Sequence, residues 1–270
     1  MGMTEALLKK AARDLTQQEA FDLFIFLVEQ DEISVVDPIK TNDAGEVTSL
    51  KPGRQVKIQT TIAGVDFFKA RGINPGANGS AGATQMASFT PTPAFAVVLY
   101  RLANWLSSEW QITRIVYGGI GAGGGANATD CHMTGHCVDF YGATTQGGQD
   151  FDVRRDWWTR TVYRKDNGKP HASNGWDRWS NDTNTYFRLA ISNDAQDQVP
   201  AQFFSDVYEF VTEQCTLGPD IADDLFRNGH PLRPGTVMHP DYPVAGVPGV
   251  VAGRRGHNDH IHFQLGNAYE

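Results

Sequence analysis

The stretch His132-Met-Thr-Gly-His-Cys-Val-Asp139 and a second stretch, His257-Asn-Asp-His-Ile-His262, look like the two halves of one metal site. Imidazole nitrogens and a carboxylate oxygen suit zinc, which uses three protein ligands and water in its catalytic sites. Side chains two positions apart on an extended strand point to the same face, so His260 and His262 are expected to face one cleft. Gly135 permits the tight backbone return between His132 and Asp139.

The composition is that of an ordinary globular protein. The chain has 270 residues, of which 40% are hydrophobic and 20% charged, so it can bury a substantial core. Its formal charge of -8 argues against a nucleic-acid or anionic-membrane surface, because both attract clusters of Lys and Arg. The sequence has no run of 18 apolar residues, so no membrane span is predicted.

The N-terminal region does not read as a secretory signal. Lys9 and Lys10 precede an apolar run at 20–28, but Glu19 and Asp22 interrupt the pattern and no small-residue cleavage site follows. The expectation is therefore synthesis in the cytoplasm. Any work outside it would need delivery by another route.

Periodicity and turn signals divide the chain into an N-terminal extension, 1–80, and a main domain, 81–270. Residues 4–28 read as helical, with Thr16 and Glu19 as a capping box that starts a second helix. The β-branched runs at 33–36 and 56–62 predict strands, and the loop at 74–84 marks the boundary.

In the main domain, Thr92 and Pro93 predict a helix start, 111–117 a strand, 201–213 a helix and 254–265 a terminal strand. A long, loop-rich insertion is expected at about 145–250. The glycine run at 118–125 lacks the context of a nucleotide-binding loop and reads as a flexible rim of the site.

The cysteines leave two alternatives open. Cys131 and Cys137 flank the first histidine motif, so a small disulfide could fix that loop in an oxidising compartment. Buried, reduced thiols are the other interpretation, because spacing alone does not fix connectivity.

The pattern His-x6-Asp followed much later by His-x-His resembles the LAS metallopeptidases, the group of lysostaphin, the D-Ala-D-Ala metallopeptidases and Sonic hedgehog. The His-x-x-His-x-His form of the second motif is most similar to penicillin-insensitive murein endopeptidases and zinc D-Ala-D-Ala carboxypeptidases. The resemblance covers roughly 84–265. It implies an α+β fold, a small antiparallel sheet flanked by helices, here with a helical N-terminal extension and the long insertion.

By position, the resemblance implies that His132, Asp139 and His262 bind Zn²⁺. His260 would lie beside the metal and donate to the oxyanion. Asp259 matches the carboxylate that accepts the proton of water, with His257 as an accessory group. Arg114, in the strand before the glycine run, is the candidate for binding a substrate carboxylate.

One position departs from the family pattern. The segment reads Gly135-His-Cys-Val-Asp139, where Gly-x-Ala-x-Asp is common, so His136 replaces a residue near the ligands. This questions the shape of the pocket and its specificity more than metal binding. His136 is also a candidate hydrogen-bond partner of a ligand.

The resemblance implies a peptidoglycan hydrolase that cuts amide bonds of the stem peptide or cross-link, with DD- or LD-endopeptidase favoured over D,D-carboxypeptidase. Without a signal, an antibacterial effector injected by a secretion system, with a cognate immunity protein, is favoured over a phage endolysin. Either would act in the periplasm or on the cell wall. The alternative of another class is a non-catalytic zinc-containing binding domain.

Overall fold

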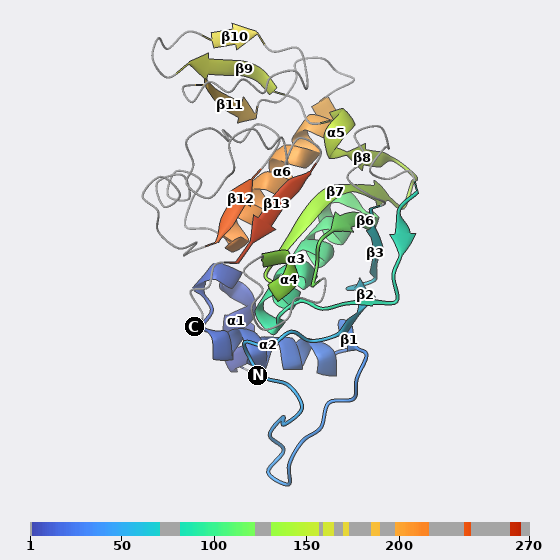
Figure 1. The fold of residues 1–270 in the computed structure, drawn as a ribbon, viewed down its shortest axis with the longest axis vertical. Coiled ribbons are helices and arrows are strands. Elements are labelled where there is room, and N and C mark those ends of the chain that lie inside the picture. Colours follow the sequence, from blue (N-terminus) through green and yellow to red (C-terminus); the bar gives the residue numbers. More distant parts are fainter. Residues whose placement is uncertain are drawn as a thin grey trace.

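The main structural unit is one large sheet covered by helices (Figure 1). The computed structural model describes residues 2–70, 82–121, 131–156, 159–164, 170–172, 185–189, 198–215, 235–238 and 260–265. Buried apolar side chains from Leu7 to Leu265 form a common core cluster within these ranges. Both ends of the described chain therefore contribute to the same core.

The large sheet is mostly antiparallel. Its main strands lie in the order β1-β2-β3-β6-β7-β13-β12, while β4, β5 and β8 pair at its sides with β3, β2 and β7. The one parallel pair among these strands is β3 with β6. The bounds are β1 Ile33–Val35, β2 Ile58–Ile62, β3 Val65–Lys69, β4 Thr84–Gln85, β5 Ser88–Phe89, β6 Ile112–Gly118, β7 Cys137–Thr145, β8 Asp150–Asp152, β12 Thr236–Met238 and β13 Ile261–Gln264.

A second, three-stranded antiparallel sheet lies in the region of the predicted insertion. Its strands are β9 (Thr159–Arg164), β10 (Pro170–Ala172) and β11 (Thr185–Leu189), with β9 in the centre. The predicted insertion at 145–250 thus contains regular structure. The remaining parts of this region lie largely outside the described residues.

Helices cover one side of the large sheet. The longest are α3 (Pro93–Trp110) and α6 (Gln198–Cys215); α3 contacts β2, β3 and β6, and α6 contacts β12 and β13. A further helix, α2 (Gln17–Glu29), packs on α3. The shorter helices are α1 (Gly2–Lys9), η1 (Ala12–Asp14), α4 (Cys131–Thr134) and α5 (Val153–Asp156).

The neighbouring strands β7 and β13 each have an apolar face and a polar face. Phe140 of β7 contacts Phe203 of α6, and Phe263 of β13 contacts Phe95 of α3. Because successive side chains of a strand point to opposite faces, the neighbouring Asp139 and His262 point away from these helices. The fold therefore presents the predicted metal ligands on the face of the sheet that the two long helices leave uncovered.

Several sequence predictions are confirmed. Thr16 and Glu19 form the predicted capping box, in which the Thr16 hydroxyl accepts from the Glu19 backbone N–H and the Glu19 carboxylate accepts from that of Thr16. Thr92 is the N-cap of α3, with Pro93 in its first turn. The predicted helix at 201–213 is α6, which is longer by three residues at its start and two at its end, and the predicted strand at 111–117 is β6, shifted by one residue to 112–118.

The fold class is confirmed at the coarse level, as mixed helix and sheet with an open, mostly antiparallel sheet. The sheet is larger than the small one expected. The reason is that β1, β2 and β3, all before residue 80, join it through the parallel pairing of β3 with β6. The N-terminal segment consequently shares the sheet of the main domain, and its interpretation as a separate extension with a delivery, wall-binding or packing role stays a prediction.

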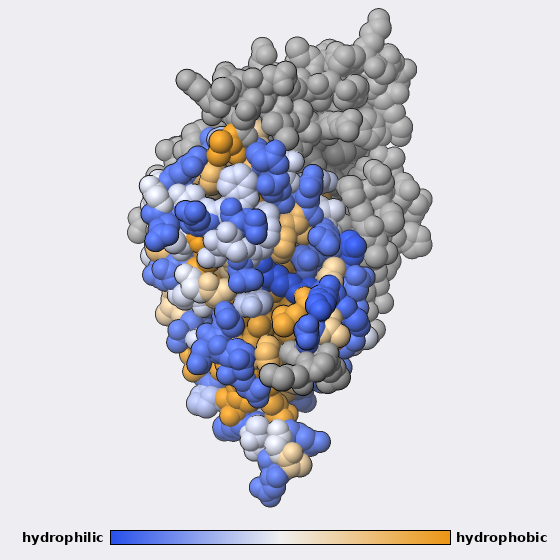
Figure 2. Space-filling model, turned by 180° about the vertical axis from the view of Figure 1, so that it is seen from behind, coloured by the Kyte–Doolittle hydropathy of each residue, from blue (hydrophilic) through white to orange (hydrophobic). Residues whose placement is uncertain are grey.

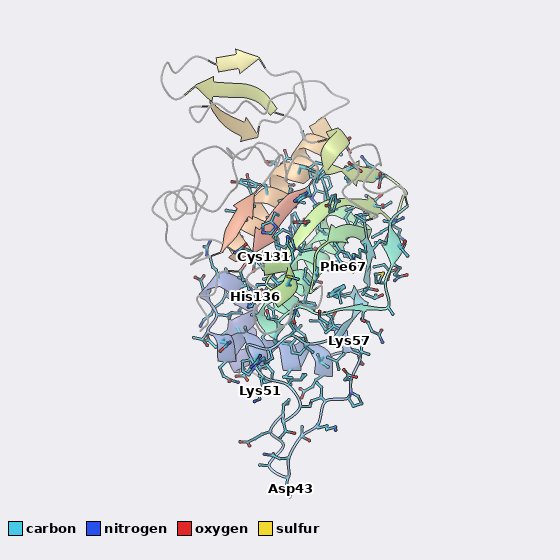
Figure 3. The ribbon with its side chains drawn as sticks, viewed as in Figure 1. Asp43, Lys51, Lys57, Phe67, Cys131 and His136 are labelled. Atoms are coloured by element: carbon cyan, nitrogen blue, oxygen red, sulfur yellow. A yellow bond between two sulfur atoms is a disulfide. The ribbon has the colours of Figure 1, made fainter. Side chains whose placement is uncertain are left out.

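The described part of the chain contains no helix long and apolar enough to cross a membrane. Figure 2 shows hydrophilic side chains interspersed with apolar ones on the face seen from behind. The long excursion between β1 and β2 carries Asp43 at its tip, far from Cys131 and His136 near the middle of the molecule (Figure 3).

We expect Phe203→Ala to lower the free energy of unfolding by about 3–5 kcal/mol, because Phe203 is fully buried and stacks on Phe151 at a centroid distance of 4.1 Å. Urea unfolding followed by circular dichroism measures this. Val199→Ala, on an exposed part of the same helix, is the matched control and should change stability by no more than about 0.5 kcal/mol. Equal effects of the two substitutions would contradict the packing described for α6.

Candidate metal centre

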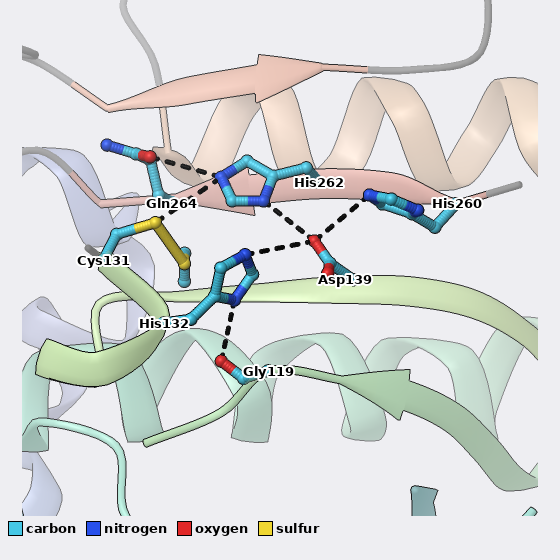
Figure 4. A network of polar contacts seen from close by, with 8 residues as sticks. Gly119, Cys131, His132, Asp139, His260, His262 and Gln264 are labelled. Atoms are coloured by element: carbon cyan, nitrogen blue, oxygen red, sulfur yellow. Dashed lines mark hydrogen bonds and ion pairs between the residues drawn. A yellow bond between two sulfur atoms is a disulfide. The ribbon is translucent and has the colours of Figure 1, made fainter. Parts of the chain in front are cut away.

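The candidate site lies where α4, β7 and β13 meet the end of β6 (Figure 4). His262 of β13 and Asp139 of β7 are directly opposite each other in the antiparallel register, and Gly118 of β6 is opposite Asp139 on its other side. His132 comes from α4, and His260 directly precedes β13. His262 and Asp139, 123 positions apart in the chain, are thus held together by sheet pairing.

Three histidine nitrogens converge on one oxygen of Asp139. His262 Nδ1 lies 2.9 Å from Asp139 Oδ1, His260 Nε2 lies 3.3 Å from it and His132 Nε2 lies 3.5 Å from it. The side chains of His260 and His262 are buried, whereas those of His132 and Asp139 remain partly exposed. The candidate ligand atoms are therefore largely buried, and solvent reaches the site from the side of His132 and Asp139.

The second ring nitrogen of two of these histidines is also engaged. His132 Nδ1 lies 2.7 Å from the carbonyl oxygen of Gly119, and His262 Nε2 lies 3.2 Å from Gln264 Oε1. Both oxygens only accept hydrogen bonds, so the ring nitrogens facing them donate. Gly119 and Gln264 hold the two imidazoles in place. Neither residue was predicted to do so, and the glycine run was interpreted only as a flexible rim of the site.

These hydrogen bonds leave lone pairs of His132 and His262 facing the carboxylate of Asp139. In a neutral imidazole one nitrogen carries the proton and the other accepts, so His132 Nε2 and His262 Nδ1 present lone pairs to the carboxylate oxygen of Asp139. Three acceptors within 3.5 Å repel each other unless positive charge lies among them. With the proton of His262 on Nε2, positive charge stabilises this arrangement, and protons on the histidines or a metal ion would supply it.

The pKa of Asp139 reflects the same constraint. Burial acts to raise the pKa of this carboxyl, but the positive charge of His260, the hydrogen bond and charge of His262, and the charge of His132 outweigh it. The pKa of Asp139 consequently lies well below its usual range. Asp139 is therefore ionised, and its charge favours a cation beside it.

The donor set fits zinc. Nitrogen and oxygen ligands lie about 2.0–2.1 Å from a tetrahedral zinc ion, which places two such ligands about 3.3 Å apart. The distances of 2.9, 3.3 and 3.5 Å to Asp139 Oδ1 bracket that separation. His260 meets the distance as well as His132 does, so its assignment as a group beside the metal stays a prediction from the family pattern.

The loop that carries His132 is fastened at several points. Cys131 and Cys137 form a disulfide across it, which is the first of the two alternatives left open by the sequence. Gly135 has a φ of 76°, and a Cβ there would meet the backbone of Thr90 and Pro91. Gln55 donates a hydrogen bond to the Met133 carbonyl at 2.8 Å, so the N-terminal segment also holds this loop.

A second group of metal-binding atoms overlaps the first. One ligand atom from each of Cys131, His132, Cys137 and His262 lies within 4.8 Å of all the others. This group could hold a metal ion, although its two cysteines are joined in the disulfide. His132 and His262 belong to both groups.

Arg114 does not lie among these ligands. It is opposite Thr144 in the register of β6 with β7, roughly 15 Å along the sheet from the position of Asp139. Its guanidinium carbon lies 4.0 Å above the ring of Phe68. The predicted contact of Arg114 with a substrate carboxylate stays a prediction.

The structure describes only some of the other predicted site residues. Asp259 and His257 lie outside the described residues. His136 is partly buried; its backbone N–H donates to the Cys131 carbonyl and its own carbonyl accepts from Leu265, both at 3.0 Å. Through its backbone, His136 therefore joins the His132 loop to the end of β13.

Comparison of the chain with protein families, with curated protein sequences and with solved structures gave no match.

We expect Gly119→Ala to weaken zinc binding by about 10- to 100-fold, the usual cost of disturbing a residue that orients a ligand. Gly119 has a φ of 67°, and a methyl group there would overlap His132 Nδ1. Competition with a chromophoric chelator measures the affinity. Gly148→Ala is the control, because Gly148 has a φ of 83° but nothing within 4 Å of its Cβ position. Equal zinc affinities in the two variants would contradict the role of Gly119.

Proposed function

We propose that this chain is a zinc-dependent peptidoglycan hydrolase, an endopeptidase that cuts an amide bond of the stem peptide or its cross-link. The observation that carries the proposal is the convergence of three imidazole nitrogens on the carboxylate of Asp139. The donor types and their spacing fit zinc, and His132, Asp139 and His262 are the residues that would hold it. The partly exposed side of the site leaves room for water and substrate.

Zinc bound there would supply Lewis acidity and lower the pKa of a coordinated water toward neutrality. The protein groups supply the rest. Asp259, by the family pattern, takes the proton of the attacking water and passes it to the leaving amine. His260, 3.3 Å from Asp139 Oδ1, would by the family pattern donate a hydrogen bond to the carbonyl oxygen as negative charge develops on it.

The substrate class rests on the likeness of the two motifs to peptidases of the cell wall. The spacing His257, His260, His262 favours an endopeptidase over a carboxypeptidase. A catalytic assignment is also supported by the ligand count. A set of two histidines and one carboxylate leaves a position for water, which a purely structural zinc site does not need.

The direct test is digestion of purified peptidoglycan, with muropeptide products identified by mass spectrometry. Wild-type protein should release products, a chelator should abolish release and added zinc should restore it. His262→Ala should lose zinc and activity together. Asp259→Asn should keep zinc and lose activity by about 10²- to 10⁴-fold, because only the base is removed.

Met133→Ala is the matched control, since it shortens an exposed side chain of the same loop that belongs to no ligand group. It should retain one zinc ion and release of muropeptides. A wild-type protein that binds zinc but releases no product from peptidoglycan would contradict the hydrolase and favour the non-catalytic zinc-containing domain.

We further propose that the enzyme is an antibacterial effector delivered to the periplasm, with an immunity protein as its partner in the producing cell. Expression behind a periplasmic export signal should lyse a sensitive bacterium. His262→Ala should be harmless at equal protein level, and Met133→Ala should remain toxic. Wild-type protein that accumulates in the periplasm without effect on growth would contradict this role.

A further inference from the structure

The two ring nitrogens of His262 face two different sets of metal ligands. Nδ1 lies 2.9 Å from Asp139 Oδ1, while Nε2 lies 3.8 Å from the sulfur of Cys131 on the other side of the ring (Figure 4). The disulfide Cys131–Cys137 thus lies beside a metal-binding histidine, and the sulfurs belong to the group of four ligand atoms within 4.8 Å.

We propose that the Cys131–Cys137 pair is a redox switch between two metal sites. When the pair is a disulfide, the metal is held by His132, Asp139 and His262 Nδ1. When the pair is reduced, both thiolates and the same two histidines, now with His262 Nε2, form a closed Cys₂His₂ site.

The geometry of the alternative site is close to what zinc requires. Zinc lies about 2.3 Å from thiolate sulfur and about 2.0 Å from imidazole nitrogen, so a sulfur and a nitrogen on one tetrahedral ion are about 3.5 Å apart. The observed separation of Cys131 Sγ and His262 Nε2 is 3.8 Å. Reduction frees the two sulfurs to separate, and the Cα atoms that carry them are 5.5 Å apart.

His132 and Asp139 suit both states, whereas the Gln264 amide oxygen, 3.2 Å from His262 Nε2, must turn away in the reduced state. His132 offers Nε2 in each, because Nδ1 donates to the Gly119 carbonyl. For His262 the roles of the two nitrogens are exchanged. In the reduced state Nε2 would bind the metal and Nδ1 would donate to Asp139 Oδ1, which is the carboxylate–histidine–metal arrangement common in zinc proteins.

The conversion balances with a dithiol as the reductant. The dithiol gives two electrons and two protons to the disulfide, the S–S bond breaks, and the dithiol becomes a disulfide. Binding of Zn²⁺ to the two thiols then releases two protons. A disulfide oxidant reverses the first step and returns His262 Nδ1 to the ligand set that contains Asp139.

The switch would keep the protein inactive in a reducing compartment. Four protein ligands leave no position for water, and two thiolates cancel the charge of Zn²⁺, so the bound ion loses the properties used in hydrolysis. This consequence for activity rests on the proposed function. The metal exchange itself does not.

Cobalt titration of the full chain tests the switch, because Co²⁺ bound by thiolate gives an intense charge-transfer absorption in the near-ultraviolet. Protein reduced with a phosphine should show this band and saturate at one equivalent. Oxidised protein should bind one equivalent without the band. The double variant Cys131→Ser, Cys137→Ser should lack the band under both conditions.

Two further variants separate the ligand sets. Asp139→Asn should lose metal when oxidised but keep the charge-transfer band when reduced, because an amide oxygen still accepts from His262 Nδ1. Cys215→Ala, at the one other cysteine, should behave like wild type; Cys215 is buried, and that burial raises the pKa of its thiol. Each variant is compared with wild type by circular dichroism.

The proposal is overturned if reduced wild-type protein shows no charge-transfer band, or if the band persists in the double cysteine variant. It is also overturned if folded Asp139→Asn lacks the band when reduced. None of these readouts uses peptidoglycan. A chain that cleaves no muropeptide but shows the exchange would contradict the proposed function alone.

Discussion

One electrostatic constraint governs the site. Histidine nitrogens face the carboxylate of Asp139, and not all of them can belong to neutral imidazoles that donate a hydrogen bond to it. Gly119 and Gln264 accept the protons of His132 Nδ1 and His262 Nε2, which aims the remaining lone pairs at Asp139 Oδ1. In this tautomer, positive charge between them stabilises the lone pairs and the anionic oxygen, which lie 2.9 and 3.5 Å apart. The pairing of β7 with β13 and the loop that carries His132 hold these groups in that arrangement.

The sheet maintains it through register. Asp139 and His262 are opposite each other, and their neighbours Phe140 and Phe263 pack on α6 and α3 from the other face. A shift of either strand by one residue would put a ligand into the apolar core and an aromatic ring onto the polar face. Burial of the phenylalanines therefore fixes the positions of the candidate metal ligands, so the same strand pairing specifies the stability of the core and the geometry of the site.

Local sequence signals predicted the parts of this structure that local physics determines. The start of α3 follows from the side chain of Thr92 and the fixed backbone of Pro93. The two histidine motifs were recognised because their side chains are of the types that bind metals. The carbonyl of Gly119 could not be predicted in the same way, because any residue has one. The role of Gln264 depends on where β13 pairs, and the parallel pairing of β3 with β6 depends on contacts distant in sequence.

The two donor groups compete for the same histidines, and charge decides between them. A disulfide is neutral and a poor ligand, so Asp139 is then the one anion beside His132 and His262 in the described part of the site. Two thiolates would bring twice the negative charge of Asp139 and softer ligands that zinc binds well. Because His262 has a nitrogen toward each group, the choice needs a proton to move across one ring and no change in the pairing of the strands.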